Sequence, residues 1–269
     1  LSSTIEGCLE SGYDIAQGGA RYNHVTLGTQ ALGSVVNSLA AIRWAVFEEK
    51  LLTMEELLDH LRNNFAGAEN IRQMLIHKAP KYGTDDPKTD ELAQWVMEVL
   101  EKTVRSHRSP VLGGPYRPIM MSSGTQVIEG FLCGASADGR LAGQAVSNGI
   151  SPANGTERNG ATAAMHSVAK ACKAHMSAGS TFNMTISPVM FKTEENLEKF
   201  TGMLLAYFEL GGRQIQINPV TVETLKDAQK NPQNYTDLLV KVTGYSFRFI
   251  DLSTALQNDI IARTEFSEI

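Results

Sequence analysis

The chain has 269 residues, of which 42% are hydrophobic and 20% charged, and its net charge is −5 at pH 7. A chain of this length buries a sizeable core, and its negative charge argues against a nucleic-acid or anionic-membrane partner. No apolar run approaches the roughly 20 residues that span a bilayer, and no signal-like segment opens the chain. We therefore expect a cytoplasmic protein. Because the sequence begins at Leu1 without a methionine, we also expect a piece of something longer.

The cysteines and histidines predict neither a disulfide framework nor a metal site. Cys8, Cys133 and Cys172 are odd in number and lack C-x-x-C spacing. The six histidines show no H-E-x-x-H motif and no paired i,i+4 spacing. We expect reduced thiols and no bound metal or cofactor.

The first third of the chain has the apolar spacing of amphipathic helices. Hydrophobic residues recur near the helical period over 33–58, and Thr53 with Glu56 forms a capping box that starts a second helix. The same spacing predicts further helices at 70–77 and 90–103. Asp90 is expected to be the N-cap of the last of these helices.

Short extended segments then alternate with helices. A Gly/Pro loop is predicted over 110–118, with strand edges at 119–123 and 126–131. Residues 134–160 are rich in Gly, Asn, Ser and Asp, and they form either a linker or a long ordered loop of functional importance. Beyond them the pattern predicts helices at 160–174 and 193–209 and strands at 182–186 and 214–218. This alternation favours an α/β fold with crossover connections.

A strand-like run near the end, residues 239–252, is interrupted by Gly244. Its flanks alternate β-branched and aromatic residues, so a side chain would be favoured where the glycine stands. A glycine in such a run usually marks a bulge or a tight bend, because it reaches backbone angles that other residues avoid.

This run also resembles the radical loop of the glycyl radical enzymes of the pyruvate formate-lyase superfamily, whose signature is an R-V-x-G-Y-type sequence. Lys241 and Phe247 depart from the family's pattern, and the lysine lacks the planar fork of the usual arginine. Other blocks resemble the family in the family's order across essentially the whole chain: GGARYN at 18–23, KYGTDD at 81–86, DGRLAG at 138–143, GISP at 149–152, SVAK at 167–170, and segments within 209–235 and 260–265.

The resemblance implies an α/β barrel of ten strands, with residues 1–220 in its later half and residues 221–269 as a glycyl radical domain. Gly244 would carry a backbone radical, installed by a separate radical S-adenosylmethionine activase. Val240, Val242, Phe247, Phe249 and Ile250 would keep that loop dry. The family acts anaerobically on small molecules, and we expect a homodimer.

Further site residues are candidates through their place in these blocks. Tyr245 and Arg248 would support the radical loop. Glu10 is either a substrate-facing carboxylate or a glutamate at the surface end of a helix. Gln126 is either a hydrogen-bond donor to substrate or an ordinary solvated side chain. Cys8 is expected to be a buried structural thiol. The catalytic cysteine of the family would lie upstream of this chain.

Several reactions are compatible with the resemblance. The scaffold supports acyl transfer, dehydration, decarboxylation and addition to fumarate. The radical loop resembles the lyase-type and fumarate-adding branches more than pyruvate formate-lyase itself. The alternatives are a pyruvate formate-lyase-type acyltransferase and a non-catalytic spare-part subunit that supplies a fresh radical domain to a damaged enzyme. The Asp138-Gly139-Arg140 turn is expected to be structural, although its arginine could bind an anion.

Overall fold

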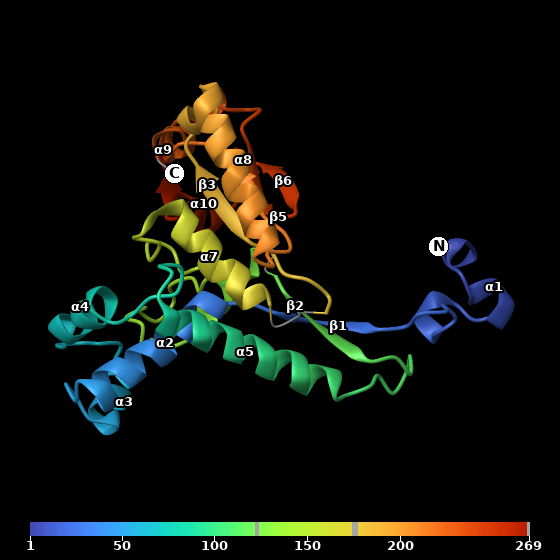
Figure 1. Cartoon of the computed structure of the whole chain (residues 1–269), viewed down its shortest axis with the longest axis horizontal. Helices are drawn as coiled ribbons and strands as arrows, with labels where there is room; N and C mark the ends of the chain where they lie inside the picture. Colours follow the sequence, from blue (N-terminus) through green and yellow to red (C-terminus); the bar gives the residue numbers. More distant parts are fainter. Residues whose placement is uncertain (122–123, 174–176, 268–269) are drawn as a thin grey trace.

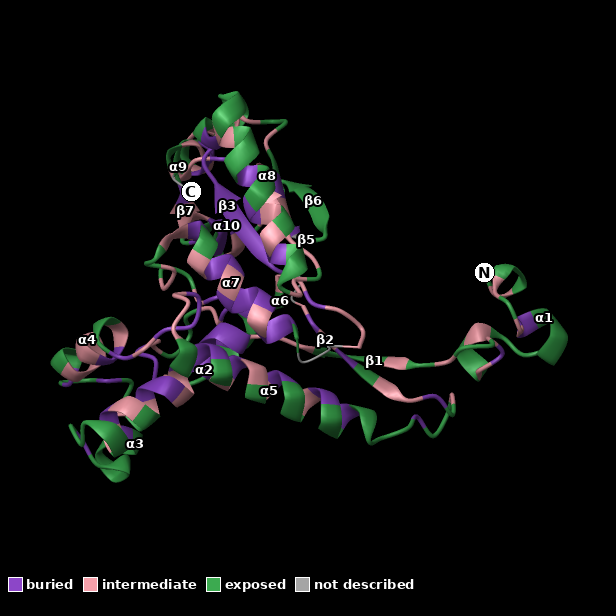
Figure 2. Ribbon diagram, in the orientation of Figure 1, coloured by how far each residue is buried: buried purple, intermediate pink, exposed green. Residues whose placement is uncertain are grey.

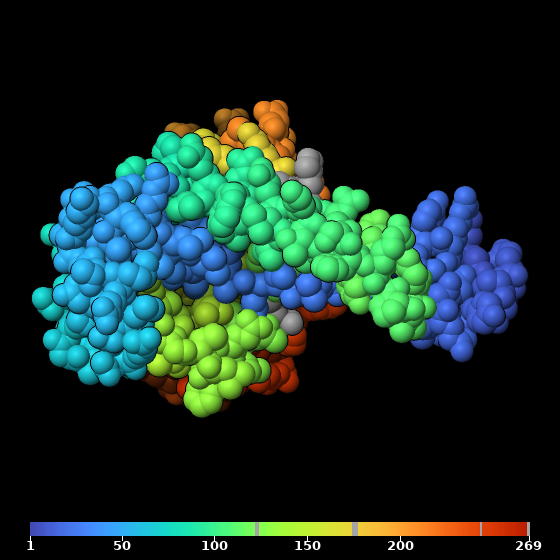
Figure 3. Space-filling view, turned by 90° about the horizontal axis from the view of Figure 1, so that it is seen from below, coloured from blue at the N-terminus to red at the C-terminus, as the bar shows by residue number. Residues whose placement is uncertain are grey.

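A computed structural model describes residues 1–121, 124–173 and 177–267. The N-terminal 24 residues form an arm that projects from the rest of the molecule (Figures 1 and 3). The arm contains a short helix, α1 (Cys8–Ser11), and leads into strand β1 (Val25–Thr29). Most of its residues are exposed, whereas Cys8 is only 4% exposed. The expectation of a buried Cys8 thiol is therefore confirmed.

Four helical segments follow β1: α2 (Leu32–Ile42), which continues as a π-helical turn over Arg43–Glu48, α3 (Met54–Arg62), α4 (Glu69–His77) and α5 (Pro87–Arg105). The predicted capping box begins α3, because the Glu56 amide donates to Thr53 Oγ1 and the Thr53 amide to Glu56 Oε2. The predicted N-cap of α5 was wrong. Asp86 caps this helix by accepting from the Lys88 amide at 2.9 Å. Pro87 occupies the first turn, where its missing N–H costs nothing.

The segment after α5 contains one strand and one helix. Strand β2 (Tyr116–Met120) pairs in parallel with β1, and Ser122 and Ser123 lie outside the described residues. The predicted strand edge at 126–131 was wrong, since helix α6 (Thr125–Leu132) covers it. The buried positions of α6 are Gln126 and Gly130. They are four residues apart, which is helical spacing rather than the alternation of a strand.

Helix α7 (Gly160–Cys172), strand β3 (Asn183–Ile186), helix α8 (Glu194–Glu209) and strand β4 (Gln216–Asn218) follow the predicted order. Strand β3 pairs in parallel with β4 on one side and with β7 (Glu265–Phe266) on the other. Every residue of β3 is buried, which marks the centre of this part of the molecule (Figure 2). Helices α2, α5, α7 and α8 contribute to the same apolar core. No described helix is long and apolar enough to span a membrane.

The last part of the chain has an apolar cluster of its own. It contains α9 (Val222–Lys230), the antiparallel pair β5 (Leu239–Thr243) and β6 (Tyr245–Arg248), and α10 (Thr254–Ile261). All members of this cluster lie between Val220 and Ile261. We call residues 220–264 the terminal unit and the other described residues the body. The unit leaves the central sheet after β4 and returns to it at β7.

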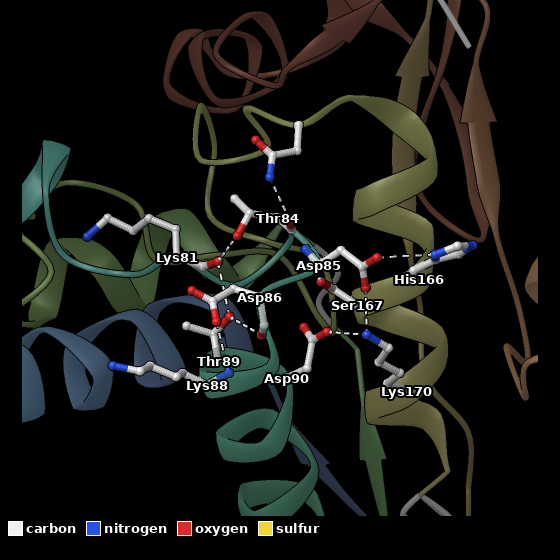
Figure 4. Close-up of polar contacts among 11 residues, drawn as sticks. Lys81, Thr84, Asp85, Asp86, Lys88, Thr89, Asp90, His166, Ser167 and Lys170 are labelled. Carbon is white, nitrogen blue, oxygen red and sulfur yellow. Dashed lines mark hydrogen bonds and ion pairs between the residues drawn. The ribbon is translucent and has the colours of Figure 1, made fainter.

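Two blocks far apart in sequence meet on the body (Figure 4). Lys170 Nζ donates to Asp85 Oδ1 at 2.5 Å and to Asp90 Oδ2 at 2.7 Å. The Asp85 amide donates to Ser167 Oγ, and His166 Nδ1 lies 3.4 Å from Asp85 Oδ2. Burial disfavours the charged Asp85 carboxyl, but hydrogen bonds from Lys170 and His166 outweigh burial and hold the pKa below its usual value. This cluster ties α7 to the start of α5.

Candidate radical site

Gly244 lies at the tip of the β5–β6 hairpin. The strands pair from Leu239 with Arg248 up to Thr243 with Tyr245, with a register shift between Lys241 and Thr243. The φ angle of Gly244 is +58°, in the left-handed region that residues with a Cβ rarely adopt. The tight bend predicted from the sequence is confirmed. The left-handed backbone of this bend is a sufficient reason for a glycine at position 244.

The two strands of the hairpin differ in exposure. Val240 and Val242 point into the cluster of the terminal unit and are 1% and 2% exposed. Tyr245 is 70% exposed and Phe247 is 45% exposed, and Gly244 is exposed too. Phe247 does not bury Gly244 within this chain, and enclosure of the loop in the full protein stays a prediction.

A side chain of β4 binds the backbone of β5. Asn218 Nδ2 donates to the Lys241 carbonyl at 3.0 Å, and the Lys241 amide donates to Asn218 Oδ1 at 2.6 Å. The side-chain amide of Asn218 thus donates one hydrogen bond to Lys241 and accepts one from it, as the backbone of a neighbouring strand would. Arg263 Nη1 also donates to the Lys241 carbonyl, at 3.3 Å. A Cβ on Gly244 would lie 3.4 Å from Gln216 Nε2, also on β4.

Arg248 lies at the far end of the hairpin from Gly244. Its Nε donates to Asp251 Oδ2 at 2.7 Å, and both side chains are more than half exposed. An exposed pair of this kind contributes little to stability. Support of the radical loop by Tyr245 and Arg248 therefore stays a prediction.

Gln126 meets the terminal unit through Asp259 of α10. Gln126 is fully buried, and its Nε2 donates to Asp259 Oδ2 at 2.8 Å. Asn154 Nδ2 donates to Asp259 Oδ1 at 3.1 Å, and Arg263 Nη2 lies 3.5 Å from Asp259 Oδ2. Burial lowers the pKa of Arg263, and the charge of Asp259 opposes that effect. The solvated alternative for Gln126 is wrong, because the side chain is buried in α6, while a contact with substrate stays a prediction.

Glu10 lies on the N-terminal arm, far from the hairpin in Figure 1. Its side chain is exposed, and Oε2 accepts from the Gly7 amide at 3.0 Å, which caps α1. The structure does not bring Glu10 and Gly244 together. A substrate-facing role for Glu10 stays a prediction.

A cavity of about 680 Å³ lies between the body and α10. The long 134–160 loop lines it together with α2, α4 and the terminal unit, so this loop is ordered rather than a linker. Lys81 on its wall is 5% exposed, and burial lowers the lysine pKa to about 8. Arg140 donates to the carbonyl oxygens of Gly134, Leu141 and Gln144, which confirms the structural interpretation of the Asp-Gly-Arg turn.

Asn218, Asp259 and Arg263 were missed as site residues. Asn218 ends a block that resembles the family, yet its local sequence gives no sign that its side chain continues a sheet. Asp259 and Arg263 have the i,i+4 spacing of an ion pair on a helix. That spacing usually indicates a solvated pair, whereas these side chains are 3% and 6% exposed.

Comparisons with known proteins assign the family. Residues 1–130 match the family model described as Pyruvate formate lyase-like, and residues 146–250, which include Gly244, match the model described as Glycine radical. The chain belongs to the glycyl radical enzyme family. The mixed α/β fold expected for the C-terminal part of such an enzyme is confirmed by these matches and by the solved structure described next.

Three of the similar proteins show the extent of the match. Trans-4-hydroxy-L-proline dehydratase of Clostridioides difficile is 40% identical over 98% of this chain and 33% of the relative. Isethionate sulfite-lyase of Bilophila wadsworthia is 36% identical over 87% of this chain and 28% of the relative. The glycerol-bound B12-independent glycerol dehydratase of Clostridium butyricum has a TM-score of 0.95 at 37% identity, covering 99% of this chain and 34% of that one. This glycyl radical enzyme chain therefore spans about a third of its relatives' length.

Proposed function

We propose that Gly244 carries a glycyl radical and that this chain is the C-terminal third of a dehydratase of the glycyl radical type. The observation that carries the proposal is the glycine itself: it stands at a left-handed hairpin tip within the segment that matches the Glycine radical family model. A glycine Cα radical is stabilised by both flanking amide groups, and no side chain hinders or fragments it. The conformational and chemical reasons for glycine thus coincide at this position.

The substrate radical is generated by a cysteine outside this chain. Among the three cysteines, Cys8 lies on the arm, and Cys172 is buried in the core of the body, where burial raises the thiol pKa. Cys133 is exposed just after α6. None of them adjoins Gly244 in the chain or belongs to the hairpin. Part of the enzyme beyond this chain then supplies the thiyl residue and covers the exposed face of the hairpin.

The reaction is elimination of water from a small hydroxylated substrate. Two of the three proteins named above are dehydratases, the relative at 40% identity and the structure at a TM-score of 0.95. Cleavage of another bond, as in the sulfite-lyase, and acyl transfer are the competing outcomes.

The enzyme has two macromolecular partners in this proposal. A radical S-adenosylmethionine activase abstracts a hydrogen atom from Gly244, and a second copy of the enzyme completes a homodimer, in the cytoplasm. Residues 1–220 contribute to the barrel and residues 221–269 form the radical domain. The self-contained apolar cluster between Val220 and Ile261 supports this boundary.

The test is activity of the full protein after anaerobic activation. The activated protein, supplied with trans-4-hydroxy-L-proline or glycerol, should release the dehydrated product, and a Gly244→Ala protein treated identically should not. Formation of an acyl-coenzyme A product instead would indicate the acyltransferase alternative. Restoration of a damaged partner enzyme without any turnover would indicate the spare-part alternative.

A further inference from the structure

Strand β4 turns two side-chain amides towards the hairpin that contains Gly244. Gln216 and Asn218 are two residues apart in this strand, so their side chains lie on the same face. Asn218 bonds the backbone of Lys241 in both directions, at 3.0 and 2.6 Å. The face of β4 that carries Gln216 is therefore the face turned to β5.

The side chain of Gln216 ends beside Gly244. Its Nε2 lies 3.4 Å from the position that a Cβ on Gly244 would take. Apart from the chain neighbours of the glycine, no other atom of the described residues comes within 4 Å of that position. Gln216 thus supplies the contact on this side of the Gly244 Cα.

The carbonyl oxygen of the same side chain contributes nothing to the stability of the described fold. Gln216 Oε1 is buried and has no hydrogen-bond partner among the described residues. Asn183, its register partner on β3, also has a buried oxygen, Oδ1, without a partner there. A buried carbonyl without a partner lowers stability, and an apolar side chain of the same length would avoid that loss. Packing and hydrogen bonding therefore do not explain why an amide stands at position 216.

A contact beside a glycine radical has a chemical effect through the backbone angles. Glycine has the freest backbone of all residues, so its angles at the hairpin tip are held by its surroundings. The unpaired electron spreads over both flanking amide groups only where these lie in the plane of the radical, and φ and ψ set that alignment. A contact that restrains these angles therefore sets how much of the spin remains on the Cα.

We propose that Gln216 is a positioning residue for the radical: its side-chain amide holds the backbone angles of Gly244 and thereby sets the spin that remains on the Cα. This role rests on the proposed radical function of Gly244. Its signature is a variant at position 216 that folds at least as stably as the original protein and yet has an altered radical.

Thermal unfolding of the unactivated full protein tests the first half of this signature. Gln216→Met keeps the length of the side chain and removes the unpartnered oxygen, so the melting temperature should stay the same or rise. Gln214→Met is the matched control, because Gln214 Oε1 accepts from the Phe182 amide at 3.1 Å. Its melting temperature should fall, since the Phe182 amide loses its partner. An equal fall in Gln216→Met would show that the amide is structural and would overturn the proposal.

Electron paramagnetic resonance of the activated full protein tests the second half. The splitting of the doublet by the remaining α hydrogen is proportional to the spin on the Cα. We expect the splitting or the line width to change in Gln216→Met and to stay unchanged in Gln214→Met. Gln216→Leu, a second apolar variant, should change the doublet as Gln216→Met does.

The outcomes at Gly244 separate this role from the proposed function. A full protein that forms no glycine-centred radical on activation would overturn the proposed function, and the role of Gln216 with it. A doublet that is identical in the original protein, Gln216→Met and Gln216→Leu would overturn the role of Gln216 alone and leave the function standing.

Discussion

Replacing Gly244 by alanine should remove the radical without unfolding the protein. The perturbation adds one methyl group at a residue whose φ is +58°. The added Cβ would lie 3.4 Å from Gln216 Nε2, the end of a side chain, which is an ordinary contact distance. The cost is therefore conformational rather than steric.

The magnitude follows from two opposing effects. A left-handed conformation costs a residue with a Cβ about 1 to 2 kcal/mol. Alanine also restricts the unfolded chain, which returns about 0.4 to 1 kcal/mol. We expect Gly244→Ala to lower the free energy of unfolding by about 1 kcal/mol, or the melting temperature by about 2 to 4 °C for a chain of this size.

Denaturant unfolding of three glycine variants measures this. Gly67 has φ of +74° and open space around its Cβ position, so Gly67→Ala should cost about the same as Gly244→Ala. Gly114→Ala should cost far more, because its Cβ would overlap the Asn23 carbonyl oxygen. A loss at Gly244 resembling that at Gly114 would refute the reasoning and would make Gly244→Ala useless as a chemical probe.

Three further predictions use other parts of the molecule. In air, the activated protein should be cut at Gly244, and an intact chain by mass spectrometry from a sample with a proven radical would count against the assignment. Cys172→Ser should lower the free energy of unfolding by about 1 to 3 kcal/mol because Cys172 is buried, whereas the exposed Cys133 should tolerate the same change. Equal losses of stability in the two variants would contradict this. Both variants of the full protein should keep full turnover. The depressed pKa of Asp85 means that its stabilising contribution is complete above its unfolded pKa of 3.8 and is lost as pH falls below it. Lys170→Met should therefore reduce the acid-induced loss of stability, and an unchanged acid profile would show that the pair contributes nothing.

Sequence patterns predicted the elements whose signals are local. The capping box at Thr53 and Glu56 and the helix over 194–209 have their signals within a few residues, and both were found. Helix α6 was missed because its exposed face carries Ile128, Phe131 and Leu132, so its apolar residues do not mark its buried side. Asp90 was wrongly predicted as the N-cap of α5, because two aspartates and a proline that precede it extend the helix start. Its role is to accept a hydrogen bond from Lys170, a tertiary contact that local sequence does not reveal.

The candidate site was predicted only where a residue acts through its own backbone. Gly244 could be found because a glycine within an aromatic and β-branched run is unusual in itself. The partners of Gln126 could not be found, since Asp259 lies 133 positions away in sequence and reaches α6 only through folding of the terminal unit. Hydrogen bonds between distant segments leave no periodic trace in a single sequence.

The central claim is that Gly244 holds the radical, and electron paramagnetic resonance of the activated full protein tests it most directly. A glycine radical keeps one α hydrogen, so the account predicts a doublet that collapses when the protein is made with α-deuterated glycine and that is absent from Gly244→Ala. The same doublet in the Gly244→Ala protein, or a signal indifferent to deuterated glycine, would contradict the account.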